Sequence, residues 1–478
     1  MPLVSSRRRS RLPVVPSAPD GSKLAAIVAG KILHEVIESG WQPGDVMASE
    51  PELIERYDIS RAVLREAVRL LEHQGVARMR RGPGGGLVVT EPTVDRIIDV
   101  AILYLHRIGA TLDEVFETRL VLEEIVAELA PQRLDESGLF HLRSLVESEA
   151  AGTEPNYRAF HELLASVTGN LALEVFVDIL SSVMLLYVPG TTPLTKETLQ
   201  ASTYAHSKIA SAVIAGDERT ARRRMRAHLE AEAAGLRRRR STRQRLDPEL
   251  VLVGPSGSKR AERLARKLLR EIVTGKLAPG AMVGMEPELI AAHDASRAVF
   301  REAISILEHH HIATMRRGRR GGLFVTAPNA SAVSDVIAIY LVRRGVSVAD
   351  IAEVRTRVEL AVVARIIDDL DTSALDELQR LVEMEQTVPE EDYVERVHDL
   401  HTALGAMTGN PVLELVVRVL VRLTRLYQME VLSAAERQAI QDEIKRTHKG
   451  IIDGIVAGDA ELARHRMRRH LEAIAAAL

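Results

Sequence analysis

The spacing of hydrophobic residues in the first part of the chain predicts three consecutive helices. Apolar positions from Leu24 onward recur every three or four residues and stop near residue 40, as on one face of an amphipathic helix. Ser49 stands three residues before Glu52 and predicts a capped second helix that ends near residue 57. Ser60 predicts the start of a third helix, from Arg61 to about residue 73.

Two short β-prone runs follow these helices, at residues 76–79 and 87–90. Between them lies a basic, glycine-rich segment at residues 80–86, which is typical of the tip of a two-stranded hairpin. Three helices followed by a basic hairpin predict a winged helix-turn-helix.

The pattern changes after Thr93 to long amphipathic helices with few strand signals. Segments with helical spacing continue to about residue 235 and predict an all-helical bundle of six or seven helices. An arginine-rich stretch then leads into Gly254-Pro255-Ser256, which is typical of a linker.

The chain contains the same order of predicted elements twice. The segments 60–82 and 296–318 are identical at 15 of 23 aligned positions, displaced by 236 residues, and both end in Met-Arg-Arg-Gly. The fold class we expect is therefore mainly α, with two tandem copies of a winged helix-turn-helix and an all-α effector domain. Each winged helix-turn-helix is called a reader below. The expected segments are a disordered basic tail (1–20), a first reader (21–92), a first helical domain (93–236), a linker (237–256), a second reader (257–328) and a second helical domain (329–478).

Composition narrows the classes of protein. The chain of 478 residues has no cysteine, which excludes disulfides and thiolate metal sites. It shows no secretory signal and no run of about 20 apolar residues that would span a membrane. These features lead us to expect a cytoplasmic protein without membrane contact. Because the net charge is −3, affinity for DNA must come from local basic patches.

Those basic patches recur in both copies. Arg61 and Arg65 lie one helical turn apart on the polar side of the third helix, as do Arg297 and Arg301. Arginine suits a recognition helix because it can donate two hydrogen bonds to guanine. Glycine beside arginine suits a wing, because the backbone can then approach the sugar-phosphate rail.

These segments resemble the GntR-type transcriptional regulators, whose winged helix carries Ser-Arg-x-x-x-Arg-Glu-Ala, then Leu-Glu, then an Arg-Gly wing. The resemblance implies that the chain binds a double-stranded DNA operator, most simply as a repressor. It also implies which residues meet the DNA: Ser60, Arg61, Arg65, Arg81, Gly82, Ser296, Arg297, Arg301, Arg317 and Gly318.

The two readers depart from that family and from each other. An arginine usual after the glutamate that opens the second helix is Pro51 in one copy and Pro287 in the other. Arg69 of the first copy corresponds to Ser305 of the second, and Gly84 to Arg320. We therefore expect an operator whose two half-sites differ.

Three histidines recur in each helical region. They are His161, His206 and His228 in the first copy, and His401, His448 and His470 in the second. The last two of each set are 22 residues apart in both copies. Imidazoles from three helices can meet around one divalent cation such as zinc.

This region resembles the helical domain of the FadR-type branch of GntR regulators, many of which hold a metal with three histidines and one aspartate. The aspartate's place is taken here by Tyr157 and Val397, so we expect either a three-histidine site, which His398 could complete in the second copy, or pockets without metal. The resemblance also implies that Arg119 and Arg355 bind a small anionic effector, a carboxylate or an acyl-coenzyme A. The alternative for each arginine is a surface salt bridge with Glu123 or Glu359, one turn away.

The sequence thus predicts a DNA-binding regulator controlled by a small anionic metabolite, and not an enzyme. The duplication predicts a pseudo-dimer within one chain or a homodimer. Two alternatives stay open, an architectural DNA-binding protein without ligand control and a metal-dependent hydrolase. No catalytic residues are assigned.

Overall fold

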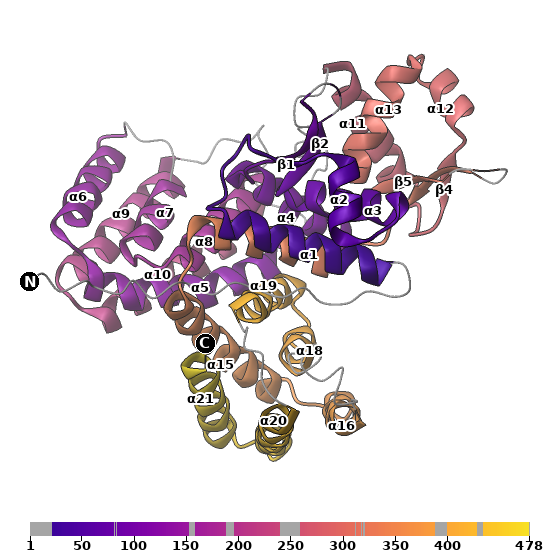
Figure 1. The fold of residues 1–478 in the computed structure, drawn as a ribbon. Coiled ribbons are helices and arrows are strands. Elements are labelled where there is room, and N and C mark those ends of the chain that lie inside the picture. The colour runs from indigo at the N-terminus through magenta and orange to yellow at the C-terminus, as the bar shows by residue number, and fades with distance from the viewer. Residues whose placement is uncertain are drawn as a thin grey trace, which may run out of the picture. The chain divides into compact units, whose positions relative to one another are not determined.

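The structure is a computed structural model, shown as a ribbon in Figure 1. It describes residues 22–80, 82, 84–152, 158–187, 196–239, 259–310, 312–316, 318, 321–387, 399–427 and 434–477. Within these ranges, no helix is long and apolar enough to cross a membrane.

The first winged helix forms as its local signals predict. Its elements are α1 (Ser22–Glu38), β1 (Val46–Ala48), α2 (Glu50–Tyr57), α3 (Arg61–Gln74), β2 (Ala77–Arg80) and β3 (Gly86–Val89). Ser49 and Glu52 form a capping box at the start of α2, and Ser60 caps α3 by accepting from the Val63 amide at 3.3 Å. Pro51 lies in the first turn of α2, where a proline removes no helical hydrogen bond.

The expected two-stranded hairpin is instead part of a three-stranded antiparallel sheet. The strand order is β1-β3-β2, with Ala77 paired to Val89 and Arg80 paired to Gly86. β1 was not predicted, because it has only three residues and directly follows the turn after α1. Gly86 of β3 lies directly against β1. A Cβ at this position would lie 2.5 Å from the Ala48 carbonyl oxygen.

The second winged helix repeats this arrangement. Its elements are α11 (Lys259–Thr274), β4 (Met282–Gly284), α12 (Glu286–Ala292), α13 (Arg297–His309), β5 (Ala313–Arg316) and β6 (Gly322–Val325), with strand order β4-β6-β5. Ser296 caps α13 through the Val299 amide.

The helical regions follow each reader. The first contains α4 (Val94–Ile108), α5 (Leu112–Arg133), α6 (Glu136–Ala150), α7 (Arg158–Val167), α8 (Leu171–Tyr187), α9 (Lys196–Ile214) and α10 (Glu218–Arg239). The second contains α14 (Ala330–Arg344), α15 (Val348–Asp368), α16 (Thr372–Thr387), α18 (Asp399–Met407), α19 (Pro411–Tyr427), α20 (Ala434–Val456) and α21 (Ala460–Ala476). Because α10 continues to Arg239, the first residues of the expected linker are helical, and residues 240–256 lie outside the described ranges.

Two compact units divide the chain, and each draws on both halves of the sequence. One unit comprises residues 1–92, 335–409 and 416–478, and the other comprises 93–334 and 410–415. Each therefore joins one winged helix to most of the helical domain from the other half. In the first unit Ile339 of α14 is buried in the core of the first winged helix, and Arg343 pairs with Glu91 at 2.9 Å. In the second unit Arg107 of α4 donates to the carbonyl of Thr326.

Candidate DNA-reading and effector sites

The two recognition helices present the expected arginines to solvent. Arg61 and Arg65 are exposed on α3, and Arg297 and Arg301 are exposed on α13. The opposite face of α3 is buried through Leu64, Ala67, Val68 and Leu71, which sets the orientation of the arginine face.

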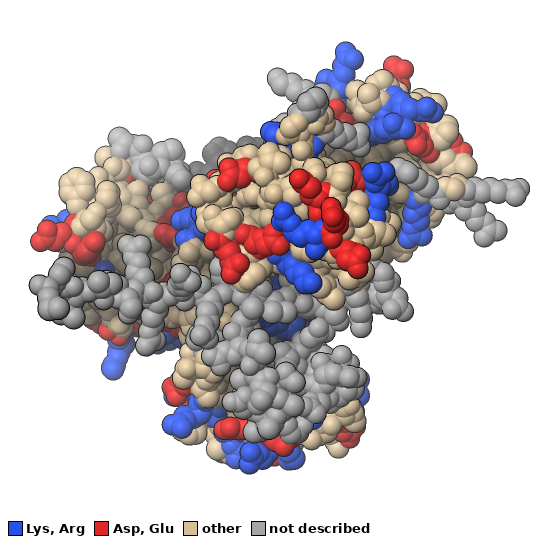
Figure 2. Space-filling model, viewed as in Figure 1, with Lys and Arg blue, Asp and Glu red and all other residues tan. Residues whose placement is uncertain are grey.

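The first arginine of each recognition helix pairs with an acidic residue at the start of the preceding helix. Arg61 Nε lies 2.8 Å from Glu50 Oε1, and Arg297 Nε lies 3.7 Å from Glu286 Oε1. Both pairs are largely exposed, and exposed ion pairs contribute about 0–1 kcal/mol to stability. DNA phosphates or bases can therefore displace the glutamates with little loss of free energy. Over α1 and α2, Figure 2 shows acidic and basic side chains interspersed.

The wings are described only in part. Gly82 and Gly318 have φ angles of 97° and 108°, in the region that favours glycine. Arg81 and Arg317 lie outside the described residues, so their assignment to DNA stays a prediction. The Arg80 guanidinium donates to the Gly84 carbonyl at 2.8 Å and braces the tip of the first wing.

The three histidines of the first helical domain meet in its interior. His161 lies on α7, His206 on α9 and His228 on α10, and all three are buried. Their Nε2 atoms face one another: His228 lies 3.2 Å from His206 and 3.4 Å from His161.

The second helical domain repeats this cluster. His401, His448 and His470 come from α18, α20 and α21 and are also buried. The Nε2 of His470 lies 3.2 Å from that of His401 and 3.0 Å from that of His448.

Glutamates orient two histidines of each cluster. In the first domain the Nδ1 of His161 bonds to Glu123, and that of His206 bonds to Glu149 at 2.8 Å. In the second, His401 bonds to Glu359, and His448 bonds to Glu385 at 2.6 Å. A carboxylate only accepts, so each Nδ1 carries the proton and each Nε2 presents a lone pair.

Ionised carboxylates support this tautomer. Burial by itself would raise the pKa of Glu123, but Arg119 and His161 outweigh it, and the pKa falls to about 2. Burial likewise raises the pKa of Glu359, but His401 and Arg355, which both hydrogen-bond to this carboxylate, outweigh it and lower the pKa to about 2. Burial also lowers the pKa of His228 to about 3 and of His401 to about 4, which keeps these imidazoles neutral.

The donor set fits a divalent cation. All three nitrogen atoms of each cluster lie within 4.8 Å of one another. Lone pairs that converge at 3.0–3.4 Å repel one another unless a proton or a cation lies between them. Ligands at about 2.0–2.1 Å from a tetrahedral zinc lie roughly 3.3 Å apart, which these separations match closely.

Glu149 and Glu385 were not among the site residues expected from the sequence. A signal was available, since 385 − 149 = 236 is also the displacement between Arg119 and Arg355. Tyr157, Val397 and His398, which bear on the aspartate position, lie outside the described residues.

The arginines expected to bind an effector are buried beside the histidine clusters. Arg119 Nε donates to Glu123 at 2.7 Å, and Arg355 Nε donates to Glu359 at 2.6 Å. Only 4% of the Arg119 side chain and 2% of the Arg355 side chain are exposed. The salt bridges expected as the alternative therefore form in both domains, but in the interior and not at the surface.

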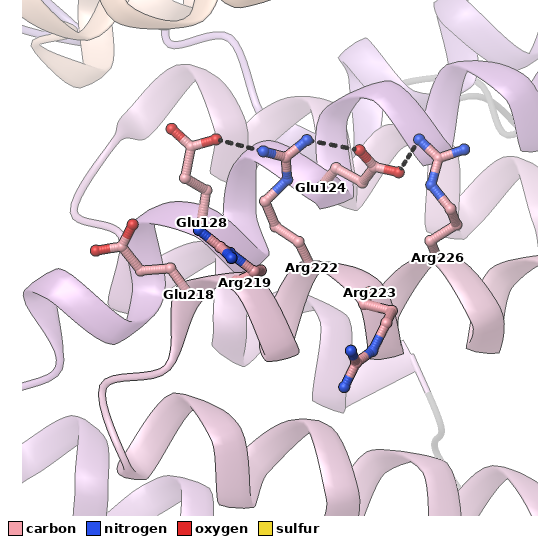
Figure 3. Close-up of a pocket in the computed structure, with 7 residues that line it drawn as sticks. All are labelled: Glu124, Glu128, Glu218, Arg219, Arg222, Arg223 and Arg226. Carbon is pink, nitrogen blue, oxygen red and sulfur yellow. Dashed lines mark hydrogen bonds and ion pairs between the residues drawn. The ribbon is translucent and has the colours of Figure 1, made fainter.

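A hollow lies beside the first turns of α10. It is lined by Glu124, Glu128 and the arginines of the first turns of α10, as Figure 3 shows. Glu124 lies between Arg222 and Arg226, and Arg222 also approaches Glu128 at 3.5 Å. Arg222 and Arg226 thus pair with these glutamates at the surface, so this hollow is a weaker candidate for an effector site than the buried arginines.

Two family models match this chain, and each of them matches once in each half. The model described as "Bacterial regulatory proteins, gntR family" matches residues 24–87 and 260–325. The model described as "FCD domain" matches residues 114–231 and 350–473, which together exceed half of the chain.

Curated relatives carry the names of regulators. The chain is 28% identical over 199 residues to "HTH-type transcriptional regulator LutR" of Bacillus subtilis, covering 39% of this chain and 90% of that protein. It is 27% identical over 158 residues to the "Uxu operon transcriptional regulator" of Escherichia coli, covering 31% of this chain and 60% of that protein.

Parts of the chain also align with solved structures. A chain titled "Streptococcus agalactiae GntR" is 23% identical, with a TM-score of 0.32 and coverage of 44% of this chain and 99% of that one. "E. coli McbR/YncC" is 20% identical, with a TM-score of 0.24 and coverage of 46% and 98%.

Proposed function

This chain belongs to the gntR family of bacterial regulatory proteins and carries an FCD domain in each half, and on that premise we propose a repressor with two different readers. It is a DNA-binding transcriptional regulator with metabolite-sensing helical domains. The proposal of two different readers rests on the exposed arginine pair at the N-terminus of each capped recognition helix.

In this proposal Arg61 and Arg65 read one half-site and Arg297 and Arg301 read the other. Ser60 and Ser296, with Arg81, Gly82, Arg317 and Gly318 of the wings, contact the sugar-phosphate backbone and set the register. Ser305 stands on the second recognition helix where the exposed Arg69 stands on the first, so the second reader has one cation fewer and the half-sites differ.

The histidine clusters would hold one divalent cation each. His161, His206 and His228 would bind one ion, and His401, His448 and His470 the other, with the glutamates holding the rings in place. Such an ion, when bound, offers a Lewis-acid position to an anionic ligand. The buried arginines supply positive charge at the same end of the helical domain.

The proposed control is a shift in population between arrangements of the readers. An anionic metabolite that binds one arrangement better than another moves the equilibrium by its difference in affinity. The first winged helix shares a core with α14, so the helical domain of that unit has a direct structural connection to a reader.

An enzymatic role fits the site poorly. A metal-dependent hydrolase needs a general base free to take a proton. The glutamates nearest the described histidines are instead bonded to imidazole rings, and Glu123 and Glu359 to arginines as well.

The test is selection of bound sequences from a random DNA duplex pool, followed by titration of the winning site and a scrambled control at two salt concentrations. We expect a two-part site bound at least about 10³-fold more tightly than the control. The absence of an enriched site, with affinity that only falls as salt rises, would indicate phosphate attraction alone and favour an architectural protein.

A further inference from the structure

We propose that the C-terminal helical domain alone senses a small carboxylate, and that Glu232 occupies the anion's place in the N-terminal domain. The inference rests on the proposed function, because it assigns the effector to one of two FCD domains. It is carried by what surrounds Arg119 and Arg355, whose own positions in the fold correspond.

In the N-terminal domain the arginine is neutralised from within the chain. Beyond its bond to Glu123, Arg119 donates from Nη1 to Glu232 Oε2 at 3.2 Å. Glu232 lies on α10, one turn after His228, and a third of its side chain is exposed. It thus reaches the arginine from the solvent side, the direction from which a ligand would arrive.

In the C-terminal domain that carboxylate is missing. The residue one turn after His470 on α21 is Ile474, which cannot accept a hydrogen bond. Arg355 donates from Nη1 to the Thr424 hydroxyl at 2.9 Å, which adds no negative charge. Its Nη2 is buried without a hydrogen-bond partner among the described residues.

The space beside the two arginines differs as well. Phe116 lies against Arg119, with its ring centroid 5.6 Å from the guanidinium carbon, whereas the corresponding residue beside Arg355 is Ala352. Ala352, Thr424 and Ile474 line a small cavity that also contacts Arg355. Its ≈ 10 Å³ would hold about one water-sized group, such as one end of a carboxylate.

Charge decides which domain needs a ligand. Among the residues that the structure describes, Arg119 has two carboxylates within hydrogen-bond range, whereas Arg355 has one, Glu359, which it shares with His401. A buried donor without a partner is costly, and bonds between arginine and carboxylate are among the strong ones. A ligand carboxylate that accepts from Nη2 would therefore neutralise Arg355 in the C-terminal domain, as Glu232 neutralises Arg119 in the N-terminal domain.

The experiment is calorimetric titration of the full-length, zinc-loaded chain with acetate, succinate and citrate as probes. We expect at least one probe to bind, with one site per chain. Ile474→Glu should weaken that binding at least about tenfold by supplying an internal acid, whereas Ile474→Gln, of similar size but neutral, should retain it. Arg355→Gln should abolish binding.

Glu472→Gln serves as the matched control, because Glu472 is exposed two residues before Ile474. The inference would be overturned by two sites per chain, by equal binding in the Glu and Gln variants of Ile474, or by no binding of any probe up to about 10 mM. Operator binding is measured on the same samples without any carboxylate. If the operator is bound while the carboxylate result is negative, this inference fails and the proposed regulator function stands.

Discussion

The two helical domains have the same histidine cluster and different surroundings for the same buried arginine. Each cluster brings three Nε2 atoms together and orients two rings with glutamates from corresponding helices. Beside Arg119 stand a phenylalanine and a glutamate, and beside Arg355 a threonine and an isoleucine. The two copies therefore share the histidine geometry and differ in the pocket beside it.

The largest expected effect tests whether the two clusters are equivalent. His470→Ala should remove one of two bound zinc ions per chain, and His228→Ala should do the same, because three imidazoles are needed to hold each ion. Metal content per chain after dialysis, measured by mass spectrometry, gives the result. His465→Ala on the same α21 is the control, and a wild-type chain without zinc would contradict the shared cation site.

A second prediction separates the two arginines by their remaining partners. Glu359→Gln should destabilise its domain by about 3–5 kcal/mol, because Arg355 is then left buried without any carboxylate. Glu123→Gln should cost less, since Arg119 keeps Glu232. Urea denaturation compares the two, and equal losses would mean that Glu232 does not neutralise Arg119.

A third prediction compares the readers. Arg61→Ala should cost about 1–3 kcal/mol of operator binding and relax one base position in its half-site, and Arg297→Ala should do so in the other half-site. Anisotropy titrations on operators altered in one half-site at a time measure this. An equal loss on random DNA would assign these arginines to phosphate contacts instead.

The smallest effect concerns the arginines that connect a helical region to a winged helix. Arg343→Ala should cost about 0–1 kcal/mol, because its pair with Glu91 is partly exposed. Arg107→Ala should cost more, since Arg107 donates to a backbone carbonyl and is sufficiently buried for its pKa to fall to about 10. Thermal unfolding distinguishes them, and a larger loss for Arg343 would reverse this order.

Features that depend on neighbours in sequence were predictable. Ser49 and Ser60 cap the helices they were expected to cap, because capping joins residues three apart. The meeting of three histidines was also predictable, since recurrence in two copies marked them. The three-residue β1 was missed because so short a run has no distinctive pattern.

By itself, the sequence determined the duplication, the readers, the helical class and the histidines, because local spacing and internal repetition encode them. Only the tertiary structure decided that Glu149 and Glu385 orient histidines and that each winged helix shares a unit with the other half's helical domain. It also decided that Glu232 meets Arg119 across 113 residues. Such contacts depend on how distant helices pack, and the free energy of burying a charge selects its partner by distance in space rather than in sequence.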